Sequence, residues 1–321
     1  MKYYLPLFLS LLFLSCQNNS SKTKFDFTLD GVKKQISFQE TKRLLFTLAA
    51  DSMKGRDSKN GGYAKAATFV ASYFKEHQIK PFYPAYRDSL EGEGHSSYNL
   101  VGQVGAYDPN KKTILIGAHL DHIGIGGKAL DSIFNGANDN ATGSTAVLQI
   151  GRFLAQHQWN QNVVLGLFAD EEKGLLGAYH LAERFKNEGV KIDYMINFEM
   201  IGKILTTGAN QVYMTGYERS NMADVLHTIT PNFVQFLPEA KAYNLFQRSD
   251  NYAFYNVMGI PAHTLSSFDF KNYDYYHKVE DEADKMDVEN MHQIIATATY
   301  AITQLLAQEN EMLLLSTEEE N

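Results

Sequence analysis

Residues 162–178 read NVVLGLFADEEKGLLGA, an apolar run followed at once by three consecutive carboxylates. A short apolar run of this length is typical of a strand buried on both faces of a parallel sheet. At the end of such a strand, Asp170, Glu171 and Glu172 should repel one another and lose hydration. We therefore expect a positively charged partner that compensates the cluster.

Three further apolar runs predict buried strands: KTILIGAH (112–119), YMINFEM (194–200) and GIPAHTLS (259–266). Two segments place their apolar residues on one helical stripe: GGYAKAATFVASYFKEHQ (61–78) and GSTAVLQIGRFLAQHQ (143–158). Strand-like and helix-like segments alternate with short polar joins, which predicts a single α/β domain. We place that domain at residues 37–308 and expect the acidic tail 309–321 to be frayed.

The N-terminus, MKYYLPLFLSLLFLSC, has a lysine followed by an apolar run of signal-peptide length. Cys16 is the only cysteine of the chain and ends that run in a manner that resembles the lipobox of bacterial lipoproteins. The alternative is a plain secretory signal with an incidental cysteine. We expect residues 1–16 to be a lipoprotein signal, 17–36 a polar tether, and the protein an exported cell-envelope lipoprotein held on a membrane by lipid on Cys16.

Composition limits the classes of partner. Hydrophobic residues make up 44% and charged residues 21% of the chain, as in ordinary soluble globular domains. The net charge of -8 lacks the basic surface that a phosphate backbone requires. A nucleic acid is therefore excluded as the expected partner.

Polar residues with metal-binding chemistry follow the predicted strands. His119 ends one strand, Glu171 and Glu172 follow another, and Glu199 follows a third. In open α/β sheets the ligand site lies beyond the carboxyl ends of the strands, so these residues are expected to share one site. His119 and Asp121 are two apart, a spacing that suits a histidine ligand oriented by a carboxylate. A single H-x-D is commonly incidental, so this interpretation depends on the combination.

The segment GANDNATG (136–143) places Asp139 in a turn just before a predicted helix. Taken alone, Asp139 is equally well interpreted as a helix N-cap. Its small neighbours, however, permit a metal and a substrate to approach closely, so Asp139 could bridge two cations. Adjacent side chains leave the backbone in different directions, so one of Glu171 and Glu172 can bind metal while the other transfers protons.

In this order, the segments resemble the co-catalytic di-zinc aminopeptidases of metallopeptidase family twenty-eight. The resemblance extends from DSMKGRDSKNGGYAKAA (51–67) through AHLDHIG, GANDNATG, FADEEKGLLGA, NFEMIG and RSDNYAFYNVMGIPA to YYHKVEDEADKMD (275–287). It implies a three-layer α/β sandwich with a mixed, mostly parallel central sheet flanked by helices. It also implies a zinc-dependent exopeptidase that removes N-terminal residues from peptide substrates.

The resemblance implies two zinc ions and assigns their ligands. One zinc would be bound by His119 and Glu199, the other by Glu172 and His277, and Asp139 would bridge both. The family usually has aspartate in place of Glu199, and the longer side chain is expected to alter metal spacing or the contact with the substrate amine.

The resemblance also assigns catalytic roles. Asp121 would orient His119, Glu171 would act as general base, and Tyr276 would donate a hydrogen bond to the developing oxyanion. Arg248 either contacts the substrate or forms an ordinary ion pair. The family's usual histidine after Asp250 is Asn251 here, which leaves the role of that loop open.

Two other functions remain as alternatives. A glutaminyl cyclase-like enzyme would use one zinc and typically carries tryptophan at the position of Tyr276. A binding protein on the same fold would have lost ligands, whereas all five candidate positions retain ligating side chains. For His122 and His263 the sequence favours a structural role, because AHLDH requires only one histidine as a metal ligand.

Overall fold

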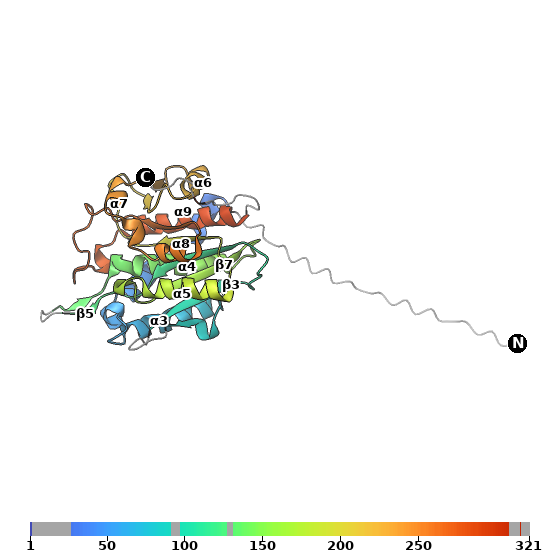
Figure 1. Ribbon diagram of the computed structural model, residues 1–321, viewed down its shortest axis with the longest axis horizontal. Coiled ribbons are helices and arrows are strands. Elements are labelled where there is room, and N and C mark those ends of the chain that lie inside the picture. The colour runs from blue at the N-terminus through green and yellow to red at the C-terminus, as the bar shows by residue number, and fades with distance from the viewer. Residues whose placement is uncertain (2–26, 91–96, 127–130, 308–314, 316–321) are drawn as a thin grey trace.

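A mixed β-sheet lies between two layers of helices in the computed structural model, which describes residues 1, 27–90, 97–126, 131–307 and 315 (Figure 1). In these residues the sheet has nine strands in the order β1-β3-β7-β4-β8-β11-β9-β10, with β2 also beside β3. The strands are β1 (Lys80–Pro81), β2 (Arg87–Ser89), β3 (Tyr98–Val104), β4 (Thr113–His119), β7 (Asn162–Phe168), β8 (Tyr194–Phe198), β9 (Val212–Met214), β10 (Val234–Gln235) and β11 (Ala262–Ser266). The separate hairpin of β5 (Gly124–Ile125) and β6 (Ile133–Phe134) extends from the body of the molecule (Figure 1).

The four central strands β7, β4, β8 and β11 are parallel, and the strands on either side join them in antiparallel fashion. Every residue of β4 and β7 is buried. This burial explains why both strands are continuously apolar, because a parallel sheet is covered on both faces. All four predicted strands and the mixed sheet are confirmed.

The core has two parts, one on each face of the sheet, because alternate residues of a strand face opposite helical layers. On one face, Ile114 and Ile116 of β4 pack with α1 (Leu29–Gln35), α2 (Phe38–Leu48), α3 (Gly62–Glu76), α4 (Thr142–Leu154) and α9 (Val288–Ala307). On the opposite face, Leu115 packs with α5 (Leu176–Glu188) and α8 (Asn251–Met258). The short helices α6 (Met222–Ile229) and α7 (Pro238–Ala242) lie near β10 and the site loops. The predicted helices at 61–78 and 143–158 correspond to α3 and α4.

The domain begins earlier than the expected residue 37. Helix α1 lies inside the segment 17–36 that the sequence indicated to be a tether, and it packs against α9. Val32 and Ile36 are buried, so the domain includes this helix because its apolar residues complete the core. Cys16, most of the expected signal segment and most of the tail 309–321 lie outside the described residues. No described helix combines the length and apolar character needed to cross a membrane.

Candidate metal centre

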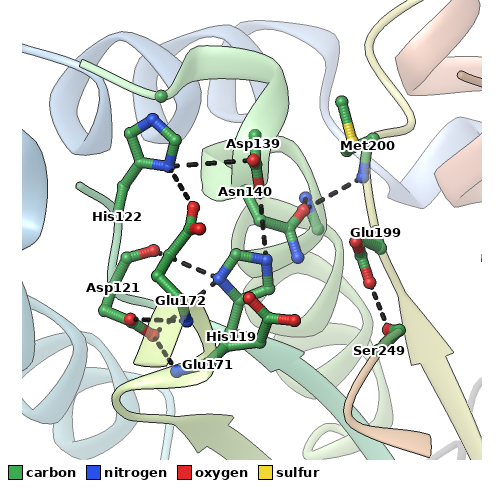
Figure 2. A network of polar contacts seen from close by, with 12 residues as sticks. His119, Asp121, His122, Asp139, Asn140, Glu171, Glu172, Glu199, Met200 and Ser249 are labelled. Atoms are coloured by element: carbon green, nitrogen blue, oxygen red, sulfur yellow. Dashed lines mark hydrogen bonds and ion pairs between the residues drawn. The ribbon is translucent and has the colours of Figure 1, made fainter. Parts of the chain in front are cut away.

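The carboxyl ends of the parallel strands bring the predicted residues together (Figure 2). His119 is the last residue of β4, Glu199 follows β8, and the acidic turn follows β7. Because these three strands are parallel neighbours, their ends meet at one edge of the sheet. This is the arrangement expected from the sequence.

Asp139 lies at the middle of the cluster. Its Oδ1 is 3.2 Å from His119 Nε2, and its Oδ2 is 3.1 Å from His277 Nε2. The two oxygens of one buried carboxylate therefore face two different histidines, as a carboxylate that bridges two cations must. Burial raises the pKa of Asp139, but contacts with His119 and His277 outweigh it and hold the pKa well below its usual range.

The three carboxylates that follow β7 have three different surroundings. Asp170 accepts hydrogen bonds from Lys173 (2.6 Å), Ser58 (3.0 Å) and Ser97, so its charge is compensated outside the cluster. Glu172 points into the cluster, with Oε2 3.2 Å from His277 Nε2. Burial raises the pKa of Glu171 well above its usual range, with the charge of His119 opposing that shift. The neighbours Glu171 and Glu172 thus face different parts of the site (Figure 2).

Asp121 acts differently from the sequence expectation. The Nδ1 atom of His119 is 3.1 Å from the main-chain carbonyl oxygen of Asp121 and 3.8 Å from its carboxylate. The carboxylate instead accepts the main-chain N–H groups of Glu171 (3.0 Å) and Glu172 (3.3 Å). Asp121 therefore orients His119 through its backbone, and its side chain fixes the turn that carries both glutamates.

Glu199 lies beside a buried pair that the sequence did not single out. The Ser249 hydroxyl donates a hydrogen bond to Glu199 Oε2 (Figure 2). The adjacent Asp250 is fully buried, and neither of its carboxylate oxygens has a hydrogen-bond partner among the described residues. Burial raises the pKa of Glu199 to about 7, opposed by the charge of His119 and reinforced by that of Asp139. Carboxylates so close together are costly unless a cation neutralises them.

Asn251, whose role was open, fastens α8 to the sheet. Its Nδ2 donates to the main-chain carbonyls of Ala262 (3.2 Å) and Phe246 (3.3 Å), and its Oδ1 accepts from Thr264 Oγ1 (2.7 Å). The side chain is therefore occupied with structural contacts rather than directed at the site.

His122 belongs to the cluster, contrary to the structural role that the sequence favoured. It is buried, and ligand atoms of His122, Asp139 and Glu172 all lie within 4.8 Å of one another. The only signal in the sequence was its place three residues after His119. That signal is weak by itself, because Asp139 and Glu172, which lie next to His122 in the fold, come from distant segments of the sequence.

Arg56 holds the loops of the site through hydrogen bonds to their main chain. Its buried guanidinium donates to the main-chain carbonyls of Leu120 (2.8 Å), Asn135 (2.5 Å) and Gly136 (2.7 Å), and also to those of Leu48 and Asp139. Burial lowers the pKa of Arg56 to about 10, although nearby carboxylates oppose the shift. One side chain thus holds the ends of the two loops that carry His122 and Asp139.

Two further contacts hold the turn around Asp139. The carboxylate of Asp281 accepts the main-chain N–H groups of Asn138 (2.8 Å) and Asp139 (3.1 Å). The side-chain oxygen of Asn140 accepts the N–H of Met200 (3.1 Å), which joins this turn to the segment carrying Glu199. These contacts fix Asp139 relative to both neighbouring loops.

Tyr276 and Arg248 border a small cavity beside the cluster. Glu199, Leu245, Phe268 and Phe270 are among its other lining residues. The Tyr276 ring stacks on His277 with centroids 3.9 Å apart, and burial raises the pKa of its hydroxyl above the usual range, so the hydroxyl keeps its proton. The side chain of Arg248 is exposed at this cavity.

The donor atoms fit a divalent cation such as zinc. Four buried atoms of the cluster have no hydrogen-bond partner within the described part of the chain: His119 Nε2, both ring nitrogens of His122, and Glu172 Oε1. Buried polar atoms are ordinarily hydrogen-bonded, so several unpartnered atoms in one place indicate another kind of partner. Imidazole nitrogens and carboxylate oxygens are common zinc ligands.

The fold and this cluster of donors define an α/β domain with a candidate metal centre. The model of peptidase family M28 matches residues 99–302, more than half of the chain, and the chain belongs to that family. A probable zinc metalloprotease of Pyrenophora teres f. teres is 34% identical over 103 residues, which cover 32% of this chain and 21% of that protein. The chain thus spans about a fifth of the length of the curated relatives that it matches.

Two solved structures show the same fold. The LapA aminopeptidase of Legionella pneumophila matches with a TM-score of 0.70 and 18% identity, over 88% of this chain and 77% of its own. The glutaminyl cyclase of Porphyromonas gingivalis matches with a TM-score of 0.65 and 15% identity, over 84% of this chain and 99% of its own. One fold therefore occurs with two activities, and the choice between them must come from the site.

Proposed function

We propose that this chain is an aminopeptidase that binds two zinc ions and hydrolyses N-terminal residues from peptides. The observation that carries the proposal is the position of Asp139, of which one carboxylate oxygen faces His119 and the other faces His277. A single-zinc enzyme does not require a carboxylate shared in this way. His119 and Glu199 would complete one zinc site, and Glu172 and His277 the other.

Zinc bound there would supply a Lewis acid and make a water molecule acidic enough to react near neutral pH. Glu171 is half-buried beside the cluster, and its raised pKa suits a group that takes a proton from the attacking water and returns it to the leaving amine. The turn that carries Glu171 is fixed by Asp121, so the base keeps its orientation.

The substrate would be bound by groups on the β8 and β11 side of the cluster. Glu199 lines the cavity, and its carboxylate oxygens suit a hydrogen bond from a protonated α-amine. Phe268 and Phe270 offer an apolar surface for one side chain of the substrate. Tyr276 retains its proton and can donate a hydrogen bond to the developing oxyanion.

The test is a panel of free and N-acylated peptides, assayed with the purified domain before and after chelator treatment. We expect about two zinc ions per chain, release of free N-terminal amino acids only from unblocked peptides, and recovery of activity when zinc is restored. One tightly bound zinc together with pyroglutamate formation from N-terminal glutamine would replace this proposal with a glutaminyl cyclase.

We also propose that lipid on Cys16 anchors the protein to a membrane of the cell envelope. The support is the apolar run that this sole cysteine ends. Cys16→Ala is expected to move the protein from the membrane fraction to the soluble fraction, as measured by fractionation and immunoblotting. Membrane association that survives the substitution would contradict the anchor.

A further inference from the structure

His122 lies against the same two carboxylates that His277 contacts. Its Nδ1 is 2.7 Å from Glu172 Oε1 and 3.8 Å from Asp139 Oδ2, and these contacts are drawn in Figure 2. His277 approaches the other oxygen of Glu172 at 3.2 Å and the same oxygen of Asp139 at 3.1 Å. The two imidazole rings meet edge to face with centroids 5.8 Å apart. Two histidines and two carboxylates therefore surround one small volume.

Ordinary hydrogen bonding does not account for the position of His122. Both of its ring nitrogens are buried and have no hydrogen-bond partner in the residues that the structure describes, even though Glu172 Oε1 is close to one of them. Ligand atoms bound to one zinc ion at about 2.0–2.2 Å in tetrahedral geometry lie about 3.3–3.6 Å apart. The four nitrogen–oxygen distances in this group range from 2.7 to 3.8 Å, which brackets that separation.

The protein backbone is adapted to hold the His122 ring in this place. A Cβ atom on Gly136 would lie 2.4 Å from the Cγ and Cδ2 atoms of the ring, so only glycine permits the contact. Gly136 also has φ +56°, a conformation that glycine adopts without strain. Its carbonyl, in turn, is bound by Arg56, which fixes the surface on which the ring rests.

We propose that His122 is a direct ligand of the zinc ion bound by Asp139, Glu172 and His277. This inference rests on the proposed function and deepens it, because it makes the two zinc sites unequal. Four protein ligands close the coordination shell of the site that contains His122, as in structural zinc sites. The site of His119, Asp139 and Glu199 has three and keeps a position for water or substrate. The closed site should therefore bind zinc more tightly.

The first experiment uses the wild-type chain. Chelator-treated protein is loaded with one equivalent of Zn²⁺, and X-ray absorption spectroscopy counts the imidazole ligands. We expect two imidazoles around the first zinc and an average of about 1.5 after the second equivalent. One imidazole per zinc at both loadings would overturn the assignment of His122. This measurement needs no variant, so it remains decisive where a substitution impairs folding.

The second experiment compares His122→Asn with the control His292→Asn. His292 is also buried and its Nδ1 lacks a hydrogen-bond partner, but it packs on α9 against Phe38. Competition with a chromophoric chelator should show the tighter zinc weakened by more than about 100-fold in His122→Asn, beyond the 10–100-fold typical of an outer-shell change. The control should bind zinc as the wild type does. The zinc-free variants should melt at similar temperatures.

The outcomes separate this inference from the proposed function. Unchanged zinc affinity in His122→Asn, with peptide cleavage intact in the wild type, would overturn the role of His122 alone. A wild-type chain that binds no zinc would overturn both.

Discussion

His122 and His263 are both buried histidines, and the sequence favoured a structural role for each. The structure separates them. The ring of His263 is 2.9 Å from the carbonyl oxygen of Thr215 through Nδ1 and 2.7 Å from Ser220 Oγ through Nε2, so both nitrogens have partners. The ring of His122 lies near two carboxylates, and no described residue forms a hydrogen bond with it. The difference shows that hydrogen-bond partners of the ring nitrogens, rather than burial of the ring, distinguish a structural histidine from a candidate ligand.

The same distinction applies to the region around each residue. The two groups that contact the His263 ring, Thr215 and Ser220, are neutral and hydrogen-bonded to it, so the ring requires no further partner. Near His122, carboxylates outnumber the basic groups, and Arg56 is occupied by main-chain carbonyls. The first region should therefore be stable without metal, and the second should depend on it.

The largest effect is expected from the two neighbouring glutamates. Glu172→Ala removes a ligand and should lose zinc, activity and the thermal stability that zinc binding adds. Glu171→Ala should keep both zinc ions and lose kcat by about 10²–10⁴, because only the proton carrier is removed. Metal analysis and steady-state kinetics on the two variants measure these effects.

The opposite result would reverse the roles of the pair. Loss of zinc from Glu171→Ala, with zinc retained by Glu172→Ala, would make Glu171 the ligand. If both variants remained fully active, the reaction would have to occur elsewhere in the molecule.

A smaller effect, on stability, is expected from Arg56→Met. The substitution leaves buried carbonyls without donors and buried carboxylates without the nearby positive charge. We expect it to lower the free energy of unfolding by about 3–5 kcal/mol, measured by urea denaturation. The matched control is Arg43→Met, because the Arg43 side chain is 49% exposed and pairs with Glu40. That change should cost about 1 kcal/mol or less.

Equal losses in the two arginine variants would contradict a supporting role for Arg56. Arg56→Lys provides a second reading, since lysine keeps the charge but cannot reach several carbonyls in the fork geometry of arginine. The free energy of unfolding of Arg56→Lys should fall between those of the wild type and Arg56→Met.

The sequence predicted the features that depend on the pattern of apolar and polar residues within a short segment. The apolar runs located β4, β7, β8 and β11, and the polar residues at their ends located the site, because parallel strands end at one edge. The roles of Arg56 and Asp250 could not be predicted in this way. Four of the five carbonyls that Arg56 contacts are 64 to 83 residues away. The carboxylate oxygens of Asp250 have no hydrogen-bond partner among the described residues, which only the folded structure reveals. Contacts between residues so far apart in the chain produce no pattern in the local sequence from which they could be predicted.

The Asp121 carboxylate illustrates the same limit. Its spacing from His119 correctly indicated that the two residues act together. Its side chain, however, binds the main chain of a turn 50 residues later, and that turn's geometry is not encoded near Asp121. The sequence thus identified the pair, while the structure determined which atoms make the contact.

The smallest predicted effect concerns the metal-independent region around His263. Burial lowers the pKa of His263 to about 4, reinforced by the charge of Arg219 and opposed by the hydrogen bond to Thr215. The unfolded chain has the ordinary histidine pKa of about 6.5 and binds the proton more readily between these two values. The folded state should therefore be most stable above about pH 6.5 and lose about 3 kcal/mol as the pH falls to about 4.

His263→Gln isolates this contribution, because glutamine can donate to Thr215 and accept from Ser220 but does not titrate. The zinc-free wild type and variant are unfolded in urea at several pH values, so that titration of the metal-centre residues affects both equally. The stability of the wild type relative to the variant should decrease by about 3 kcal/mol between pH 7 and pH 4. A constant difference over that range would mean that His263 takes up a proton as readily in the folded state as in the unfolded chain, with its Nε2–H then donating to Ser220 Oγ. In that case, His263 and His122 would differ less than their surroundings indicate.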